Sequence, residues 1–317
     1  MNEEIFEFSS VTRDNLKSIR KNQSLDCERR ICELSELCDG AADVAKALFD
    51  EGLGIYEILG LLSERMADDG AAVHDILLLE NEARLGAYLS LLSSYDRAVF
   101  SELFCEKLDS LGIGVGEDVF LPTDSADESF VYVRNRLADE AYDIFSAEFE
   151  DPTVSYASSF KEAARAVSDG KAEYCLLPLE EGGGARLAGI AALIFSEELK
   201  INSVTPVFGF DGSADMKYAL VSRHFTVPAE EEGDDRYLEI RLPAEDGLVL
   251  SELFAVSGAL GISTYRINTL YFDSAEGSVP YYSIVFRNRR RDFSRLLVYL
   301  TLFCASYTAV GIYKNLE

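Results

Sequence analysis

The chain has 317 residues, a length that suggests two or three domains. Of these residues 48% are hydrophobic and 27% charged, as is typical of folded soluble proteins. Its 56 acidic and 29 basic residues give a net charge of −27, which disfavours binding to nucleic acid or anionic membranes. We find no apolar run as long as a membrane span, and the acidic start "MNEEIFEF" does not resemble a signal peptide. These features predict a cytoplasmic protein.

The N-terminal region, residues 1–112, is predicted to be a helical domain. Apolar residues recur at spacings of three and four in "CERRICELSELC" and in the longer segments that follow it. Asp39 with Gly40, and then residues 68–70, are expected to separate these helices. Residues 113–129 combine glycine, proline and acidic residues without periodicity, and they are predicted to form a linker.

Residues 130–225 alternate between short apolar strands and amphipathic helices, which is typical of a layered α/β lobe. The third strand, "EYCLLPLE", leads into the sequence "EGGGARLAGIAALIF", where glycines precede a helix. A glycine loop at a helix N-terminus favours anion binding. Glu180 and Glu181 stand immediately before Gly182, Gly183 and Gly184, so two carboxylates are expected at the mouth of this candidate site.

Residues 236–317 follow the order strand, helix, strand, strand, helix, strand, which predicts a ferredoxin-like βαββαβ domain. The predicted fold class is therefore α+β, with an N-terminal helical domain, a single α/β lobe and a ferredoxin-like C-terminal domain.

Metal and covalent chemistry have little support in the sequence. None of the six cysteines forms a C-x-x-C pair, and the chain has two histidines, His74 and His224. No G-x-S-x-G motif of a serine hydrolase is present. Cys175 and Cys304 lie in apolar segments and are expected to be buried thiols. We therefore predict no metal site and no cofactor.

From about Phe130 to its end, the chain resembles prephenate dehydratase, the enzyme that forms phenylpyruvate in phenylalanine biosynthesis. The best local match is "SFKEAARAVSDGKAEYCLLPLEEGG", which resembles the family's helix, strand and Pro-Ile-Glu-Asn-Ser turn. In that family an ACT domain follows the catalytic lobes and binds phenylalanine as a feedback inhibitor. The resemblance implies that residues 236–317 are an ACT-like domain, that an amino acid or small carboxylate is the ligand, and that the protein is a homodimer through this domain.

The sequence also departs from the family at the positions that carry its chemistry. Met216, Lys217 and Tyr218 stand where the family has Thr-Arg-Phe. Methionine has no hydroxyl to move a proton, and lysine lacks the planar fork of arginine. The seven residues "GFDGSAD" occupy the place of a whole second lobe, so half of the catalytic cleft is expected to be missing.

Glu181 replaces the asparagine of the family's turn, and a like charge this close to an anion costs on the order of a few kcal/mol at an effective dielectric of about 20. We interpret the glycine loop as retained architecture without anion binding. The alternative is that Glu180 and Glu181 meet a cationic ligand or a partner's basic residue.

In the ACT-like domain, the resemblance places ligand contacts at Gly247 and Leu248, where the first helix begins, and at Asn268 and Thr269, at the end of the second strand. The leading hypothesis is a prephenate dehydratase-like protein that is catalytically impaired and senses an amino acid or small molecule. One alternative is an active dehydratase in which Ser213 or Ser222 supplies the hydroxyl. The other is a non-enzymatic dimerisation scaffold.

Overall fold

The computed structural model describes the backbone of residues 10–67, 92–121, 128–209, 214–226, 235–244, 247–274, 277–289, 292–304 and 306–316. Most of the helical segment expected at residues 72–96 lies outside these ranges. We call the described part of residues 10–121 the helical region, residues 128–226 the lobe, and residues 235–316 the C-terminal unit.

The helical region contains α1 (Ser10–Asp50), α2 (Ile55–Ala67), α4 (Ser94–Ser110) and the short α5 (Glu117–Phe120). The lobe contains β1 (Ser129–Tyr132), α6 (Arg136–Ser146), β2 (Thr153–Tyr156), α7 (Phe160–Ser168), β3 (Tyr174–Glu181), α8 (Ala188–Ser196), β4 (Lys200–Phe208) and β5 (Ala214–Ser222). The C-terminal unit contains β6 (Arg236–Pro243), α9 (Gly247–Ala259), β7 (Ser263–Ser274), β8 (Gly277–Asn288), α10 (Ser294–Phe303) and β9 (Thr308–Lys314).

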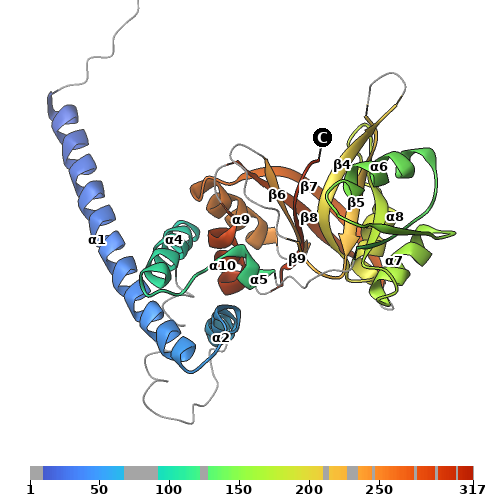
Figure 1. Ribbon diagram of the computed structural model, residues 1–317. Helices are drawn as coiled ribbons and strands as arrows, with labels where there is room; N and C mark the ends of the chain where they lie inside the picture. Colours follow the sequence, from blue (N-terminus) through green and yellow to red (C-terminus); the bar gives the residue numbers. More distant parts are fainter. Residues whose placement is uncertain are drawn as a thin grey trace, which may run out of the picture.

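Helix α1 continues through Asp39 and Gly40, so the predicted break at this position is wrong (Figure 1). A single glycine in a helix costs only about 1 kcal/mol relative to alanine. Cys38 and Ala41 are both buried on either side of it, and packing against α4 outweighs that cost. The chain turns instead at Gly52, whose φ of 99° suits glycine, and α2 begins three residues later.

One sheet runs through the lobe and the C-terminal unit, with the strand order β2-β1-β3-β5-β4-β9-β6-β8-β7 in the described chain. Strand β1 pairs in parallel with β2 and with β3. Strand β5 pairs antiparallel with β3 and with β4. The lobe meets the C-terminal unit where β4 and β9 pair, at Ile201 and Gly311. A Cβ atom at Gly311 would lie 2.2 Å from the Ile201 carbonyl oxygen, so only glycine allows this approach.

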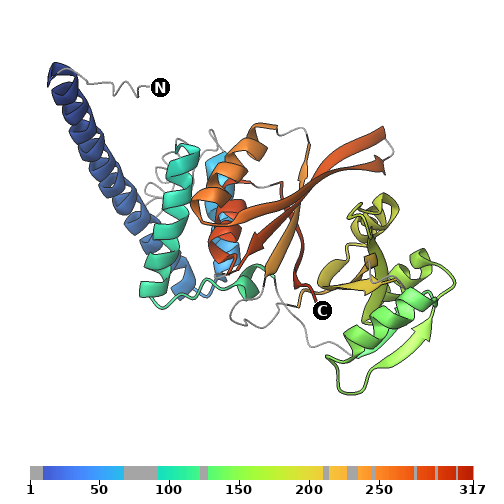
Figure 2. The same cartoon turned by 90° about the horizontal axis from the view of Figure 1, so that it is seen from above.

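Among the described elements, the helical region packs mainly on the C-terminal unit, through α4 on α9 and α10 and through α2 on α10. Figure 2 shows α4 and α2 beside α9 and α10, with the lobe at the opposite end of the molecule. A single apolar core joins these helices, in which Phe100 stacks on Phe104 at 5.4 Å between ring centroids and meets Phe303 edge-on at 6.3 Å. Burial of this shared core therefore stabilises both parts together.

The segment predicted to be a linker contributes a buried carboxylate to this core. Glu117, in α5, pairs with Arg236 at the start of β6 and accepts a hydrogen bond of 2.6 Å from the backbone N–H of Phe293. Burial raises the pKa of Glu117, although the charge of Arg236 opposes this shift. The ion pair ties the end of the helical region to both β6 and α10.

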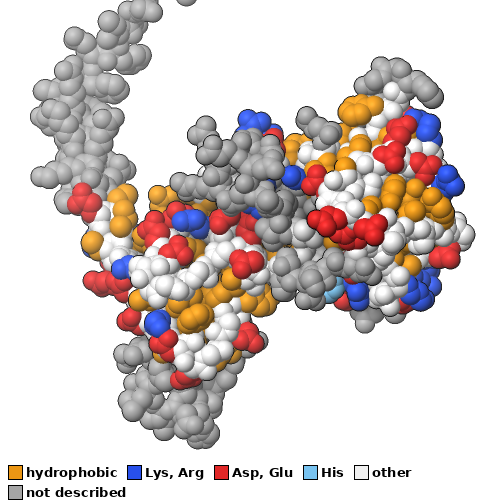
Figure 3. Space-filling view, viewed as in Figure 1, with side chains coloured by type: hydrophobic (Ala, Val, Ile, Leu, Met, Phe, Trp, Pro, Cys, Tyr) orange, Lys and Arg blue, Asp and Glu red, His pale blue; other side chains and the backbone are white. Residues whose placement is uncertain are grey.

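In the lobe, α6 covers one face of the sheet, while α7 and α8 cover the other. Helix α8 also contacts the C-terminal unit, because Phe195 stacks on Phe272 of β7 at 4.2 Å between ring centroids. Cys175 and Cys304 are buried thiols, as predicted. On the face seen in Figure 3, acidic side chains are spread over both ends of the molecule.

Two absences apply to the described residues. No helix among them is long and apolar enough to cross a membrane. No group of three or more His, Cys, Asp or Glu side chains among them is placed to hold a metal ion.

Candidate functional site

The glycine loop forms a tight turn and does not begin a helix. The N–H of Gly184 donates to the Glu181 carbonyl at 2.7 Å, and the N–H of Glu181 donates to the Ala185 carbonyl at 2.9 Å. Gly184 has a φ of 81°, which favours glycine. Helix α8 begins only at Ala188, after the N-cap residue Leu187. Residues 185–187 therefore separate the glycines from the start of the helix.

Glu180 is buried rather than placed at the mouth of a site, with 7% of its side chain exposed. Arg186 donates to Oε1 at 3.3 Å, and Arg266 pairs with the same oxygen. The Lys217 ammonium lies 4.0 Å from Oε2, an oxygen that has no hydrogen-bond partner within the described chain. The cations that meet this carboxylate therefore come from the protein itself.

The next residue has a different environment. Glu181 is exposed at the end of β3, where its register partner on β5 is Met216. Alternate residues of a strand point to opposite faces, so Glu180 and Glu181 are directed to different surroundings. The two carboxylates do not act as a pair.

A second buried carboxylate, Glu239 of β6, completes the arrangement. Arg186 donates to its two oxygens at 2.5 and 2.6 Å, Ser283 donates to Oε1 at 2.9 Å, and the Tyr313 hydroxyl donates to Oε2 at 3.4 Å. Arg186 thus bridges Glu180 of the lobe and Glu239 of the C-terminal unit. We call Glu180, Arg186, Lys217, Glu239 and Arg266 the ion cluster.

The ion cluster shifts the pKa values of its members. Burial alone would raise the pKa of Glu180, but the Arg266 hydrogen bond and the charges of Arg186, Arg266 and Lys217 lower it overall. For Arg186, burial acts to lower the pKa, but the charges of Glu239 and Glu180, with the other interactions of the site, together outweigh it and raise the pKa. Both groups therefore remain charged inside the protein.

Arg241, two residues beyond Glu239 on the same face of β6, has no carboxylate in contact among the described residues. Its guanidinium lies over the rings of Phe195 and Phe272, at 5.1 and 5.6 Å, and donates to the Ala191 carbonyl at 3.4 Å. Burial, reinforced by the charge of Arg186, lowers the pKa of Arg241 to about 10. The face of the C-terminal sheet that meets the lobe is thus rich in buried charge.

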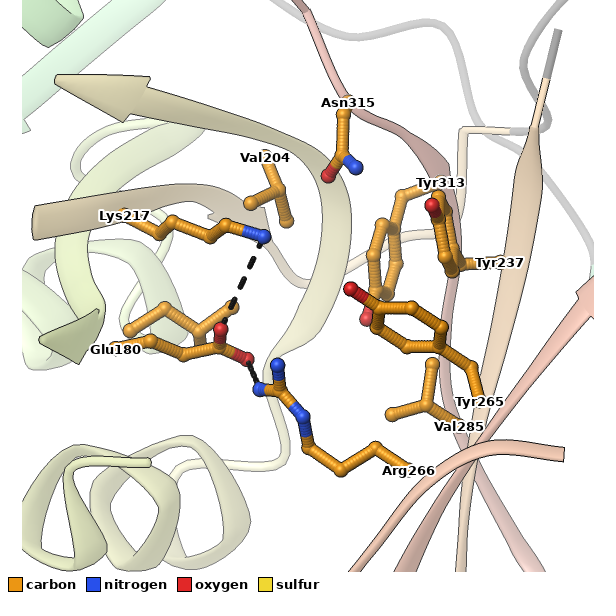
Figure 4. Close-up of a pocket in the computed structure, with 10 residues that line it drawn as sticks. Glu180, Val204, Lys217, Tyr237, Tyr265, Arg266, Val285, Tyr313 and Asn315 are labelled. Atoms are coloured by element: carbon orange, nitrogen blue, oxygen red, sulfur yellow. Dashed lines mark ion pairs between the residues drawn. The ribbon is translucent and has the colours of Figure 1, made fainter. Parts of the chain in front are cut away.

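A small cavity of about 10 Å³, room for about one water molecule, lies beside the ion cluster, and we call it the junction cavity. Figure 4 shows Glu180 and Lys217 reaching it from the lobe, and Arg266 and three tyrosines from the C-terminal unit. The tyrosines are Tyr237, Tyr265 and Tyr313. The C-terminal unit, not a second lobe, forms the wall opposite Lys217.

The positions that correspond to the dehydratase signature are divided between the two faces of β5. Tyr218 is buried on the α6 side, where its hydroxyl donates to Asn135 Oδ1 at 3.4 Å, and Met216 packs against the same cluster. Lys217 points to the opposite face, towards the junction cavity. The three side chains therefore do not converge on one point.

Ser213 and Ser222 are the candidates to replace the hydroxyl of the signature threonine. Ser222 is buried, accepts a hydrogen bond from Asn202 at 2.8 Å and donates to the His224 carbonyl at 2.6 Å. Its hydroxyl is thus committed to the structure of the lobe. Ser213 lies outside the described residues.

The ligand positions expected in the C-terminal unit are also placed by the structure. Gly247 and Leu248 open α9, as predicted. Asn268 and Thr269 lie in the middle of β7, which continues to Ser274, whereas the resemblance places the corresponding positions at the end of the strand. The β-branched and aromatic residues after them extend the pairing with β8. Asn268 Nδ2 is buried without a hydrogen-bond partner within the described chain.

Sequence reasoning missed Arg186, Glu239 and Arg266, which make most of the ion cluster. A signal for one of them was present, because "RYLEIRLP" alternates charged and apolar residues in a way that places Glu239 and Arg241 on one face. Nothing in the sequence shows that this face would be buried against the lobe.

Comparisons with known proteins give weak similarities. No protein-family model and no curated protein matches the chain. Among solved structures, it is similar to GqqA, described as a novel type of quorum quenching acylase, with a TM-score of 0.45 and 19% identity over 59% of this chain and 95% of that one.

Prephenate dehydratases also match, among them the two that follow. The structure from Streptococcus mutans has a TM-score of 0.48 and 14% identity over 60% of this chain and 100% of that one. The structure from Arthrobacter aurescens, in complex with L-Phe, has a TM-score of 0.44 and 13% identity over 59% of this chain and 90% of that one. With TM-scores below 0.5, these similarities assign neither a family nor an activity.

Proposed function

We propose that this chain is a prephenate dehydratase-like protein that has lost dehydratase chemistry and has a regulatory role, sensing an amino acid or another small molecule through its C-terminal unit. The observation that carries the proposal is the state of Glu180. Its carboxylate is buried and matched by Arg186, Arg266 and Lys217. A dianionic substrate at this turn would compete with that carboxylate for the same cations.

The described residues form a single α/β lobe, which supports the same conclusion. The lobe faces the C-terminal unit across a cavity with room for about one water molecule. Catalysis of an elimination needs a site that orients the substrate and places a proton donor beside the leaving hydroxyl. Met216 has no hydroxyl, and Ser222 is held by hydrogen bonds within the lobe.

The sensing part of the proposal rests on the C-terminal unit, which we interpret as a ferredoxin-like, ACT-like domain. Its elements follow the order strand, helix, strand, strand, helix, strand, and its strands lie in the order β9-β6-β8-β7. This order agrees with a split βαβ arrangement. Gly247 at the start of α9 would allow backbone N–H groups to approach a ligand carboxylate.

The test is an assay of phenylpyruvate formation from prephenate by concentrated purified protein. We expect no turnover above the uncatalysed rate for the wild type, nor for the Glu181→Asn/Met216→Thr double mutant. Turnover by the wild type would sink the proposal and favour an active dehydratase. In parallel, a panel of amino acids is screened for an increase in Tm, because a ligand at a hundred times its Kd adds about 2.7 kcal/mol of stability.

A dimerisation scaffold is the second candidate, favoured by the exposed edge of the sheet. Strand β7 ends the strand order, and its Ile267 and Tyr271 are 44% and 66% exposed. An edge of this kind favours pairing with another strand. If the protein is a homodimer through this edge, Ile267→Lys should convert it to a monomer in sedimentation analysis. A wild-type monomer at high concentration would contradict this candidate.

A further inference from the structure

The junction cavity has an excess of positive charge around it. Three cations of the ion cluster, Arg186, Lys217 and Arg266, face two carboxylates, Glu180 and Glu239, so the excess is 3 − 2 = 1. This excess occurs inside a chain whose net charge is −27. A charge removed from water without a counter-charge is costly, so a single negative charge in the cavity would be favourable.

Within the ion cluster, Lys217 is the cation with the least compensation. Glu180 binds Arg186 and Arg266 through Oε1, whereas the Lys217 ammonium is 4.0 Å from Oε2, too far for a hydrogen bond. Its side chain is 26% exposed and points into the junction cavity in Figure 4. Among the described residues no group accepts a hydrogen bond from this ammonium, so its three N–H donors can meet an anion.

Other polar groups of the cavity wall also carry donors, although the Tyr313 hydroxyl already donates to Glu239. The pKa of Tyr237 is raised by burial, and that of Tyr313 is raised by burial and by Glu239, so both hydroxyls stay protonated. Arg266 carries further N–H groups, and Asn315 contributes an amide. Glu180 is the carboxylate in the wall, and its proximity disfavours a ligand with two negative charges.

The outer wall is aromatic and partly open. Tyr265 lies at a β-bulge of the edge strand β7, is 43% exposed, and packs edge-on against Tyr237 at 5.1 Å between ring centroids. An apolar ring in this position offers a surface for an organic group lying outside the cavity. The cavity itself has room for one small group only.

We infer that the junction cavity receives the carboxylate of a monoanionic organic ligand, which binds Lys217 and Arg266 while its organic part lies against Tyr265. The cavity has room for about one water molecule, so it accommodates one oxygen of the carboxylate. Because Lys217 belongs to the lobe and Arg266 to the C-terminal unit, the ligand would join the two parts. This inference rests on the proposed sensing function and adds to it a ligand class and a site.

The experiment uses the full chain, with sodium acetate or sodium phenylacetate replacing sodium chloride at constant total salt. Binding is followed by Tm and by titration calorimetry. We expect a saturable increase in Tm for the wild type, with phenylacetate binding more tightly than acetate because of Tyr265. Lys217→Gln should weaken binding at least tenfold. Lys161→Gln, the same change on the exposed surface of α7, should leave it unaltered.

Arg266→Lys provides a second variant if Lys217→Gln does not fold. It keeps the positive charge and loses the two-pronged geometry, so binding should weaken without disappearing. Equal binding by wild type and Lys217→Gln, or no advantage of carboxylates over chloride, would overturn the site. Prephenate turnover would contradict the proposed function and leave binding through Lys217 measurable, so the two failures are distinguishable.

Discussion

Both faces of β6 are buried, but different interactions stabilise them. Leu238, Ile240 and Leu242 face α9 and α10 and belong to the core shared with the helical region. Glu239 and Arg241 face the lobe, where they meet charges and aromatic rings. An alternating strand usually has one face in water. Here the polar face is covered by a second part of the same chain.

Because of this difference, mutations on the two faces of β6 should reduce stability in different ways. The apolar face loses stability in proportion to the area and volume removed, and it tolerates changes that conserve volume. The charged face depends on mutual compensation, so the loss of one partner leaves the other buried without its counter-charge.

The largest effect is expected on the apolar face. Phe286→Ala, on β8 next to Leu238, should lower the free energy of unfolding by about 3–5 kcal/mol, because it leaves a cavity in the shared core. Urea unfolding measures it. The exposed Tyr271→Ala is the control, with a change within about 0.5 kcal/mol. Equal losses in the two variants would contradict a continuous core.

On the charged face, Glu239→Gln should cost roughly 3 kcal/mol, because Arg186 stays buried without its main counter-charge. The double mutant Arg186→Met/Glu239→Met should be much less destabilised than the sum of its single mutants. A double-mutant cycle by urea unfolding measures this coupling. Additive losses would show that the two side chains do not interact.

Two buried carboxyls should give opposite dependences of stability on pH. The pKa of Glu180 is lowered in the folded protein, so its contribution is present above the unfolded value and lost as pH falls through the folded pKa. The pKa of Glu117 is raised, so its contribution is present below the unfolded value and lost as pH rises through the folded pKa.

Both dependences are measured as free energies of unfolding between about pH 3 and about pH 7. This range extends from about one unit below to about three units above the ordinary pKa of a glutamate side chain. Glu180→Gln should reduce the loss of stability as the pH falls. Glu117→Gln should instead make stability fall more steeply in acid, because it removes the opposing contribution of Glu117. Parallel pH profiles for the two variants would contradict the assigned environments.

The smallest effect is expected for Ser283→Ala. This change removes one hydrogen bond of 2.9 Å to Glu239 and leaves the Arg186 pair in place, so the expected loss is about 1 kcal/mol. The matched comparison is Thr301→Val. It also removes one hydroxyl contact, but in α10, on the apolar side of the C-terminal sheet. A loss for Ser283→Ala as large as that for Glu239→Gln would mean that the serine holds the cluster together.

Much of the local structure follows from the sequence. The alternation in "RYLEIRLP" and the apolar run "YCLLPL" predict β6 and β3, and the glycines after Glu181 predict a turn. The helix break at Gly40 was wrong because packing of α1 against α4 outweighs the preference of one glycine. Lys217 was singled out from the sequence, but as a weakened signature residue and not as part of a junction.

By itself, the sequence determined the order of helices and strands, because apolar period and turn residues act over a few positions. Only the tertiary structure decided which charges meet. Glu180, Arg186, Glu239 and Arg266 come from three separate segments and are brought together by the docking of α8 and β3 on the C-terminal sheet. The register and docking of distant segments depend on burial of the whole interface, which no short stretch of sequence encodes.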